Sequence, residues 1–193
     1  MQRLSVDEFR EARKLPLVVV LDDVRSLYNV GSVFRTCDAF RVEQICLCGI
    51  TATPSQCLTE IHKTALGAED SVAWRYYKTA DEAVVELKNR GYMTLAIEQA
   101  EGSTKLQTLA EDPLFSGRNG RFAVVFGNEV KGVRQSVIDL CDRCLEIPQF
   151  GTKHSMNVSV TAGIVIWEFA RRWLTTDEEP FPALKSQQSE QPL

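Results

Sequence analysis

The sequence predicts an α/β fold: a mostly parallel six-stranded sheet with helices on both of its faces. Short apolar segments alternate with segments whose apolar residues recur at helical spacing, which is the order that builds a parallel sheet. Two of the apolar segments, residues 17–21 and 122–126, are apolar at every position. Strands of that composition are typical of a parallel sheet whose two faces are both covered by helices.

Local start and stop signals bound the predicted elements. Ser5, followed by Glu8 three residues later, fits a capping box for the first helix. Gly67 and Gly91 stand at the ends of two later helices, and Pro148 ends the last strand. The predicted strands are residues 17–21, 42–48, 72–77, 92–97, 122–126 and 143–147. The predicted helices are residues 5–14, 33–40 (after a loop or first helical turn at 28–32), 58–66, 81–89, 133–140 and a last helix that contains Val160, Ile164 and Trp167.

The 193 residues fit one domain with short ends. We expect a helical extension at 1–14, an α/β domain at 15–174 and a flexible tail at 175–193, where Pro, Gln, Ser and Glu predominate. The net charge of −4 argues against broad nonspecific affinity for nucleic acid but allows a local basic surface. No apolar run reaches the roughly 20 residues of a membrane span, and no apolar segment of a signal peptide is present, so we expect a cytoplasmic protein with no membrane association.

The six cysteines predict buried thiols and not a disulfide framework. Cys37, Cys46 and Cys48 lie in apolar segments, as small buried residues do. Cys141 and Cys144 form a single C-x-x-C that closes a helix, whereas redox pairs open one, and no second pair supplies the four ligands of zinc. We therefore expect no metal.

Three polar, glycine-containing loops follow strands of the predicted sheet, at residues 22–31, 127–132 and 148–157. Parallel sheets bind ligands at the carboxyl ends of their strands, so we expect the three loops to meet in one crevice. The glycine-rich patterns of dinucleotide and triphosphate sites are absent, as is the G-x-S-x-G elbow of serine hydrolases.

Polar side chains gather where the third loop meets the last helix. A helix start exposes N–H groups that favour polar or anionic ligands, whereas a structural cap needs only one such side chain. An ordinary capped core helix remains the alternative. The gathered residues are Thr152, Lys153, His154, Ser155, Asn157 and Ser159.

The other two loops carry candidate binding residues. Asn29 and Arg35 flank the start of one helix; Arg35 is a solvated residue, an ion-pair partner of Asp38, or a guanidinium that meets a phosphate or hydroxyl. The segment from Gly127 to Glu129 is either a turn or a backbone cradle in which Glu129 holds a cationic or hydroxylic group.

Three segments, NVGSVFRTCDAF, FAVVFGNEVKGV and IPQFGTKHSMNVSVTAGIVIWEFAR, resemble the signature motifs of the SpoU/TrmH branch of the SPOUT RNA methyltransferases, in the same order and at similar separations. The resemblance spans about residues 17–172. It implies transfer of a methyl group from S-adenosylmethionine to a ribose 2′-hydroxyl of tRNA or rRNA, a homodimer, and a deep C-terminal trefoil knot. The knot rests on the resemblance alone, since chains are as a rule unknotted.

The resemblance assigns roles position by position. Asn29 and Arg35 match the first motif, and Arg35 is similar to the family residue that activates the ribose hydroxyl. Glu129 matches the acid of the second motif, and Ser155 and Asn157 match the polar pair of the third. The cofactor would then lie in the knot, held mostly by backbone groups of Ile97, Gly127, Ile147 and Met156.

A ribose hydroxyl is a very weak acid, so its methylation needs in-line placement and a proton acceptor. An ordinary arginine is protonated and cannot accept a proton. Either the site perturbs Arg35, or Arg35 stabilises the forming alkoxide and another group takes the proton.

We expect no separate N-terminal RNA-binding domain, so the core of an acidic protein must grip the RNA, across two subunits. Two alternatives to the ribose methyltransferase remain: a catalytically inactive RNA-binding protein of the same fold, and a methyltransferase that acts on a base or a protein side chain. The complete set of motif residues speaks against the first. The expected RNA-binding residues are Arg25, Lys63, Lys131, Arg134, Lys153 and His154.

Overall fold

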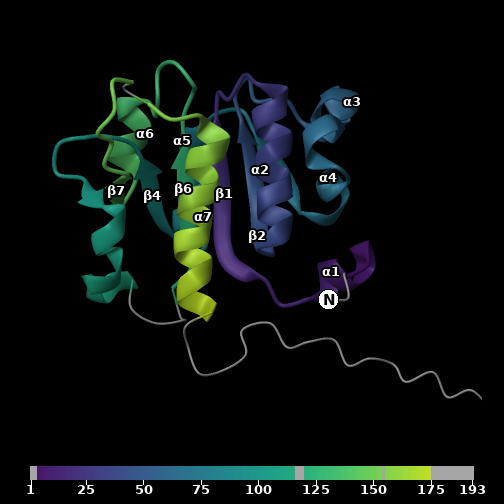
Figure 1. Cartoon of the computed structure of the whole chain (residues 1–193), viewed down its shortest axis with the longest axis horizontal. Helices are drawn as coiled ribbons and strands as arrows, with labels where there is room; N and C mark the ends of the chain where they lie inside the picture. The colour runs from purple at the N-terminus through teal and green to yellow at the C-terminus, as the bar shows by residue number, and fades with distance from the viewer. Residues whose placement is uncertain (1–3, 116–119, 154, 175–193) are drawn as a thin grey trace, which may run out of the picture.

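The computed structural model describes residues 4–115, 120–153 and 155–174. Its sheet has seven strands in the order β3-β2-β1-β6-β4-β7-β5 (Figure 1), and each ladder between the described strands is parallel. The strands are β1 (Leu15–Asp22), β2 (Val42–Cys48), β3 (Trp74–Tyr77), β4 (Met93–Ile97), β5 (Thr104–Lys105), β6 (Phe122–Phe126) and β7 (Arg143–Glu146). The helices are α1 (Val6–Glu11), α2 (Leu27–Ala39), α3 (Pro54–Ala65), α4 (Ala68–Ser71), α5 (Ala80–Asn89), α6 (Gln135–Leu140) and α7 (Val158–Leu174), with two 3-10 turns, η1 (Leu106–Glu111) and η2 (Pro113–Phe115).

Helices cover both faces of the sheet, as the sequence predicts. Along β1, alternate residues such as Val19 and Val20 enter different cores, because successive side chains of a strand point to opposite faces. The larger core joins the sheet to α2, α3, α4 and α7, and the smaller one joins it to α5 and α6. In Figure 1, α2 and α7 lie side by side in front of the sheet.

The expected count of six strands is wrong, because the polar segment after β4 contributes β5, a two-residue edge strand that pairs with β7. The loop alternative for residues 28–32 is also wrong: α2 begins at Leu27, capped by Ser26, whose side chain accepts the N–H of Asn29. The capping box of Ser5 and Glu8 is confirmed. The flexible tail expected at 175–193 lies outside the described residues.

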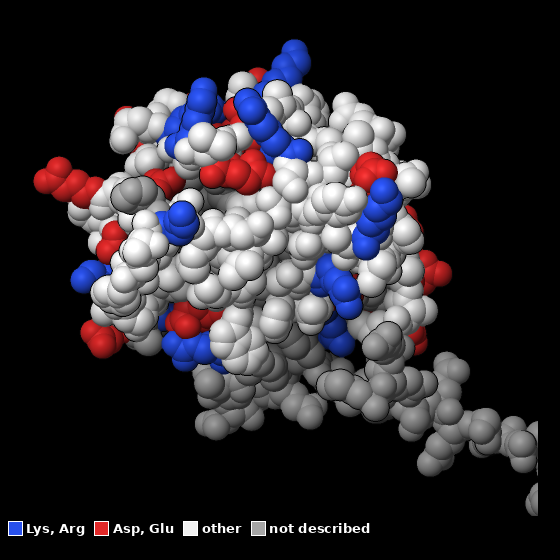
Figure 2. Space-filling model, turned by 45° about the horizontal axis from the view of Figure 1, so that its top comes forward, with Lys and Arg blue, Asp and Glu red and all other residues white. Residues whose placement is uncertain are grey.

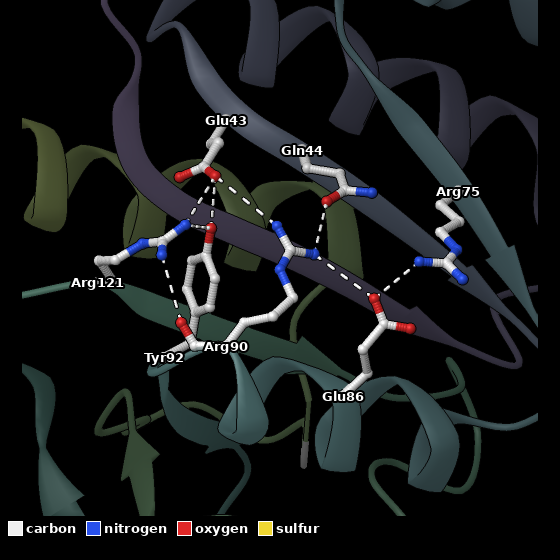
Figure 3. Close-up of polar contacts among 7 residues, drawn as sticks. All are labelled: Glu43, Gln44, Arg75, Glu86, Arg90, Tyr92 and Arg121. Carbon is white, nitrogen blue, oxygen red and sulfur yellow. Dashed lines mark hydrogen bonds and ion pairs between the residues drawn. The ribbon is translucent and has the colours of Figure 1, made fainter.

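A polar network ties together the amino ends of the strands, at the edge of the sheet away from the three loops (Figure 3). Arg121 stacks on the ring of Tyr92 and donates to Glu43 at 3.2 Å. Burial, followed by the neighbouring Glu43, raises the pKa of Tyr92 to about 12. Arg90 lies between Glu43 and Glu86, at 4.0 Å and 3.7 Å. Exposed pairs of this kind each add little stability, so the network mainly fixes where α5 ends against the sheet.

Gly31 allows α2 and α3 to pack closely. A Cβ at this position would lie 2.2 Å from Thr64 Oγ1 and 2.3 Å from the carbonyl oxygen of Ile61. The second of these atoms belongs to the backbone of α3, which cannot move aside without shifting the helix. The close packing of α2 against α3 therefore requires a residue without a side chain at position 31.

No helix within the described part of the chain is long and apolar enough to cross a membrane.

We expect Gly31→Ala to lower the free energy of unfolding by about 1–3 kcal/mol, because overpacking forces the two helices apart. Val85, on the exposed face of α5, is the control, since it is 47% exposed and belongs to neither core. Val85→Ala should change stability by less than about 1 kcal/mol, because alanine has the higher helix propensity. Urea denaturation followed by circular dichroism measures both; equal shifts of the two variants would contradict the packing argument.

Candidate functional site

A pocket of about 500 Å³ opens at the carboxyl ends of β4 and β6, beside the start of α7. Its size lies within the usual range of small-molecule sites. Five segments build its wall: the ends of β4, β6 and β7 with the loops that follow them, α6, and the first turn of α7. The pocket therefore lies where parallel sheets bind ligands, and in Figure 1 these loops form the top of the molecule.

The loop after β6 folds back on itself around Asn128. Its backbone exchanges hydrogen bonds with Gly132 at 3.1 Å and 2.9 Å. Its side-chain oxygen accepts the N–H groups of Val130 and Lys131, and its side-chain amide donates to the carbonyl oxygen of Asp23 at 2.7 Å. One asparagine thus shapes the loop and fastens it to the end of β1.

Two glycines of this loop are required by close contacts. A Cβ on Gly127 would lie 2.1 Å from the backbone of Gly132. Gly132 has a φ of +67°, and a Cβ there would lie 2.1 Å from Glu98 Oε2. Other residues rarely adopt such a φ, so the loop keeps its tight shape only with glycine.

Glu98 holds the loops after β4 and β6 together, and the sequence analysis did not identify it. Its carboxylate accepts the N–H groups of Val133 at 3.0 Å and Gln99 at 2.8 Å, and it lines the pocket. A usable signal was present, because an acidic residue directly follows an apolar strand here, as Asp22 and Asp23 end the β1 segment.

Glu129 joins the loop after β6 to the loop after β1. It accepts the backbone N–H groups of Arg25 at 3.1 Å and Ser26 at 3.0 Å, and the side-chain amide of Asn29 at 3.2 Å. Burial alone would raise the pKa of Glu129, but these N–H donors outweigh burial and lower the pKa below its ordinary value. The carboxylate is therefore ionised and holds the two loops together.

Asn157 connects the loop after β7 to Asn29 and so to the other two loops. Its side-chain amide donates to Asn29 Oδ1 at 3.1 Å, and its oxygen accepts the N–H of Ser159 at 2.8 Å in the first turn of α7. Asn157 is therefore both the cap of α7 and part of a polar chain from Glu129 through Asn29. The predicted convergence of the three loops is confirmed.

The residues that the sequence analysis assigned to cofactor binding line one pocket. Two of the expected catalytic residues, Glu129 and Ser155, also line it, and Asn29 and Asn157 are connected to it through the hydrogen bonds of Glu129. The expected cofactor-binding residues in the wall are Ile97, Gly127, Ile147 and Met156.

Arg35 lies elsewhere in the single chain. It is exposed on the outer surface of α2, in a shallow depression that it shares with Phe40 and Lys63. Asp38, which the sequence offered as its ion-pair partner, instead accepts the hydroxyl of Ser71 at 2.5 Å. In a single chain, the hydrogen bonds that connect Glu129, Asn29 and Asn157 are therefore complete, but Arg35 does not line the pocket.

Three of the expected RNA-binding residues, Arg25, Lys131 and Arg134, line one small pocket, whereas Lys63 lies in the depression beside Arg35. Figure 2 shows Lys and Arg side chains beside Asp and Glu side chains on the face in view. Arg134 pairs with Asp22 and Asp81, at 3.3 Å and 2.7 Å, and Lys63 pairs with Glu60 at 2.7 Å. The small pocket that Arg25 lines has a volume of about 110 Å³ and adjoins the main pocket, and Lys131 lines both pockets. Lys153 is exposed, and His154 lies outside the described residues.

The charge that faces the main pocket is negative. Glu98, Glu101 and Glu129 line it, against the single cation of Lys131. A wall of this charge favours a positively charged ligand. No group of three or more potential metal-ligating side chains occurs among the described residues.

Comparison with known proteins gives one family. The model of the SpoU rRNA Methylase family matches residues 16–167 of the chain. A tRNA (guanosine(18)-2'-O)-methyltransferase of Thermus thermophilus is 30% identical over 173 residues, which cover 90% of this chain and 84% of that protein. The 23S rRNA (guanosine-2'-O-)-methyltransferase RlmB of Neisseria meningitidis is 31% identical over 169 residues, which cover 85% of this chain and 62% of that protein.

Among solved structures, the AdoMet-bound rRNA methyltransferase from Sinorhizobium meliloti superposes with a TM-score of 0.71 at 26% sequence identity. The match covers 91% of this chain and 63% of that chain. This chain therefore spans less than two thirds of the length of the Neisseria and Sinorhizobium proteins.

We expect Glu129→Gln to destabilise the protein at neutral pH by about 1 kcal/mol, the usual net worth of a hydrogen bond. A carboxylate whose pKa is lowered by folding stabilises the protein above its ordinary pKa, here 4.5, and loses that contribution as the pH falls. The difference between wild type and variant should therefore shrink in acid. Urea denaturation of both proteins at a series of pH values from neutral to acid measures this difference in the free energy of unfolding.

Glu101→Gln is the control, because Glu101 is an exposed residue of the same pocket. It should match the wild type at each pH. A constant difference between Glu129→Gln and the wild type down to acid pH would show that the charge of Glu129 contributes nothing to stability.

Proposed function

The chain belongs to the SpoU rRNA methylase family, and on that premise we propose that it transfers a methyl group from S-adenosylmethionine to a ribose 2′-hydroxyl of tRNA or rRNA. The observation that carries the proposal is the polar chain from Glu129 through Asn29 to Asn157, which joins all three motif segments beside one pocket. The Thermus and Neisseria relatives bear names of tRNA and rRNA guanosine 2'-O-methyltransferases.

The pocket fits S-adenosylmethionine in size and charge. Its acidic wall suits a sulfonium cation, and Gly127 places a residue without a side chain in that wall. When bound, S-adenosylmethionine supplies a methyl group that is already electrophilic. We assign its binding to the segments that contain Ile97, Gly127, Ile147 and Met156.

The residues of the chain then have to place and activate the ribose oxygen. Ser155 lines the pocket beside Asn157, so these two residues are placed to orient the sugar. The carboxylate of Glu129 already accepts three N–H groups, so its role is to hold Asn29 and the loops in place. We assign to Arg35 the stabilisation of the ribose oxygen as its O–H bond breaks and its bond to the methyl carbon forms. The methyl–sulfur bond breaks in the same step, S-adenosylhomocysteine leaves, and the proton passes to solvent.

The position of Arg35 supports a homodimer. Beside α2, helix α7 exposes an apolar stripe of Val160, Ile164 and Trp167, which are 54%, 38% and 48% exposed. Trp167 lies against Phe40 at the end of α2, with ring centroids 5.8 Å apart. A second copy that covers this stripe in a twofold dimer would carry its own Arg35 on the adjoining surface. We propose that Arg35 of one chain serves the pocket of the other.

The path of the chain supports the trefoil knot that the resemblance implies. Strand β7 lies between β4 and β5, whereas β6 lies on the other side of β4, and η1 and η2 pack in the same core as α7. We propose that the segment from β7 to α7 threads the loop between β4 and β6, and that the protein works in the cytoplasm, where tRNA and rRNA are modified.

Incubation with methyl-labelled S-adenosylmethionine and total tRNA or rRNA, followed by digestion to nucleosides, tests the reaction. We expect label in a 2′-O-methylnucleoside. Label in a methylated base would replace the proposal with a base-directed methyltransferase. RNA binding without label would leave an inactive RNA-binding protein, and the proposal would be wrong.

In the same assay, Arg35→Ala should abolish methyl transfer while the affinity for S-adenosylmethionine stays nearly unchanged. The reason is that Arg35 lies outside the cofactor pocket of its own chain. Arg10→Ala, on the exposed surface of α1, is the control and should retain activity. Comparable loss of cofactor binding and transfer in Arg35→Ala would contradict the assigned role.

Glu129→Gln should also be inactive in transfer, because it weakens the hydrogen bonds that hold Asn29 and the loops beside the pocket. Mixing it with Arg35→Ala therefore tests whether the site is shared. If each active site takes Arg35 from one chain and Glu129 from the other, hybrid dimers contain one intact site. Refolded mixtures should regain about a quarter of wild-type activity, because half of the dimers are hybrid and half of their sites are intact. A mixture as inactive as its two components would place both residues in one chain.

A further inference from the structure

The two most exposed large apolar side chains of the described residues both belong to loops of the candidate site. Phe150 is 97% exposed and Val130 is 86% exposed, whereas the next such residues are 59% exposed. Val130 lines the main pocket, and Phe150 directly follows Gln149, which also lines it. A single exposed apolar residue needs no explanation, but two on neighbouring loops at one pocket mark a binding surface.

Folding does not account for Phe150. Its ring contributes nothing to either core, and the open space around Gly151, where nothing lies within 4 Å of a Cβ, leaves the loop uncrowded. The aromatic side chain therefore stands free on a loop, at the carboxyl end of the sheet, with its faces available to a ligand.

Unpaired cations accompany these residues. Lys131 follows Val130, and Lys153 lies three residues after Phe150; both are exposed, and neither forms an ion pair with a described residue. By contrast, Lys63 and Lys88 have carboxylate partners at 2.7 Å and 2.9 Å. Two loops that line the pocket therefore offer an aromatic face together with two ammonium groups that pair with no carboxylate of the described residues.

This combination identifies the kind of ligand. Single-stranded nucleic acid is bound by aromatic side chains on which bases stack and by cations that meet the phosphates. A duplex keeps its bases stacked on one another and offers none to Phe150. A second protein chain would favour the other exposed surface, the continuous apolar stripe of α7, over an isolated ring between lysines.

We infer that Phe150 is a stacking platform for a base next to the target ribose, and that the substrate of this enzyme is an unpaired RNA segment. The inference rests on the proposed function, because it specifies the RNA at the same pocket. Lys131 and Lys153 would hold the phosphates on either side of the stacked nucleotide. Phe150 is then a positioning residue for the substrate and not part of the chemistry.

Fluorescence of 2-aminopurine, a base whose emission falls when it stacks, tests this directly. The probe is a single-stranded oligoribonucleotide that carries 2-aminopurine, with the same strand annealed to its complement as a second probe. Binding is measured with the full chain and no S-adenosylmethionine. The variants are Phe150→Ala, Phe150→Tyr and, as a control, Val85→Ala on the exposed face of α5.

The wild type should bind the single strand and quench its emission. Phe150→Ala should weaken this binding roughly 5- to 100-fold and remove the quenching, in line with the value of one base–aromatic stack. Phe150→Tyr and Val85→Ala should behave as the wild type, and the weak binding of the duplex should be the same for all. In turnover, Phe150→Ala should raise KM for RNA and leave the affinity for S-adenosylmethionine unchanged.

Quenching by Phe150→Ala equal to that of the wild type would overturn the inference. So would dissociation of the dimer in Phe150→Ala, seen by sedimentation, because Phe150 would then belong to the contact between copies. These outcomes concern RNA binding without a methyl donor. Failure of the proposed function would show differently: the wild type itself would give no 2′-O-methyl label in the methyl-transfer assay.

Discussion

The site depends on one carboxylate that bridges two loops. Glu129, on the loop after β6, accepts two backbone N–H groups from the loop after β1 and the side chain of Asn29. Without these donors, burial would favour the neutral acid; with them the acid is ionised and its geometry is fixed. Because Asn29 in turn accepts from Asn157, the same interaction sets the start of α7. Segments more than a hundred residues apart in the chain are thereby held around one pocket.

The second constraint is the close approach of the loop after β6 to itself and to Glu98, which a side chain on Gly127 or Gly132 would prevent. Gly127 and Gly132 bring the loop after β6 so near to itself and to Glu98 that no Cβ fits at either position. The carboxylate of Glu98 then fastens this loop to the end of β4 through the N–H of Val133. Two carboxylates and two glycines therefore shape this side of the pocket.

The sequence predicted the parts of the molecule whose cause is local. The strands 42–48 and 122–126 match β2 and β6 at both ends. The continuous apolar segment 122–126 leaves a parallel strand few alternatives, and 42–48 ends in the apolar run from Ile45 to Cys48. Strand β5 was missed since Thr104 and Lys105 carry no apolar pattern, and the pairing of so short an edge strand is decided by its neighbour β7. The bond between Asn29 and Asn157, like the contacts of Glu98, joins residues distant in sequence, so motif order could suggest proximity but not the partners. The position of Arg35 on the outside of α2 was equally hidden, because helical spacing does not say which neighbour covers a helix.

The separation of Arg35 from the pocket has a consequence for how the enzyme would work. A guanidinium inside the pocket of its own chain would compete with a cationic cofactor for the carboxylates of Glu98 and Glu129. On the outer face of α2, beside the apolar stripe of α7, it stays clear of that wall. In the dimer that we propose, a second chain would bring the positive charge to the side of the pocket where RNA enters, and the acidic wall would be left to the sulfonium. The apolar stripe would then give the displaced arginine its place of action.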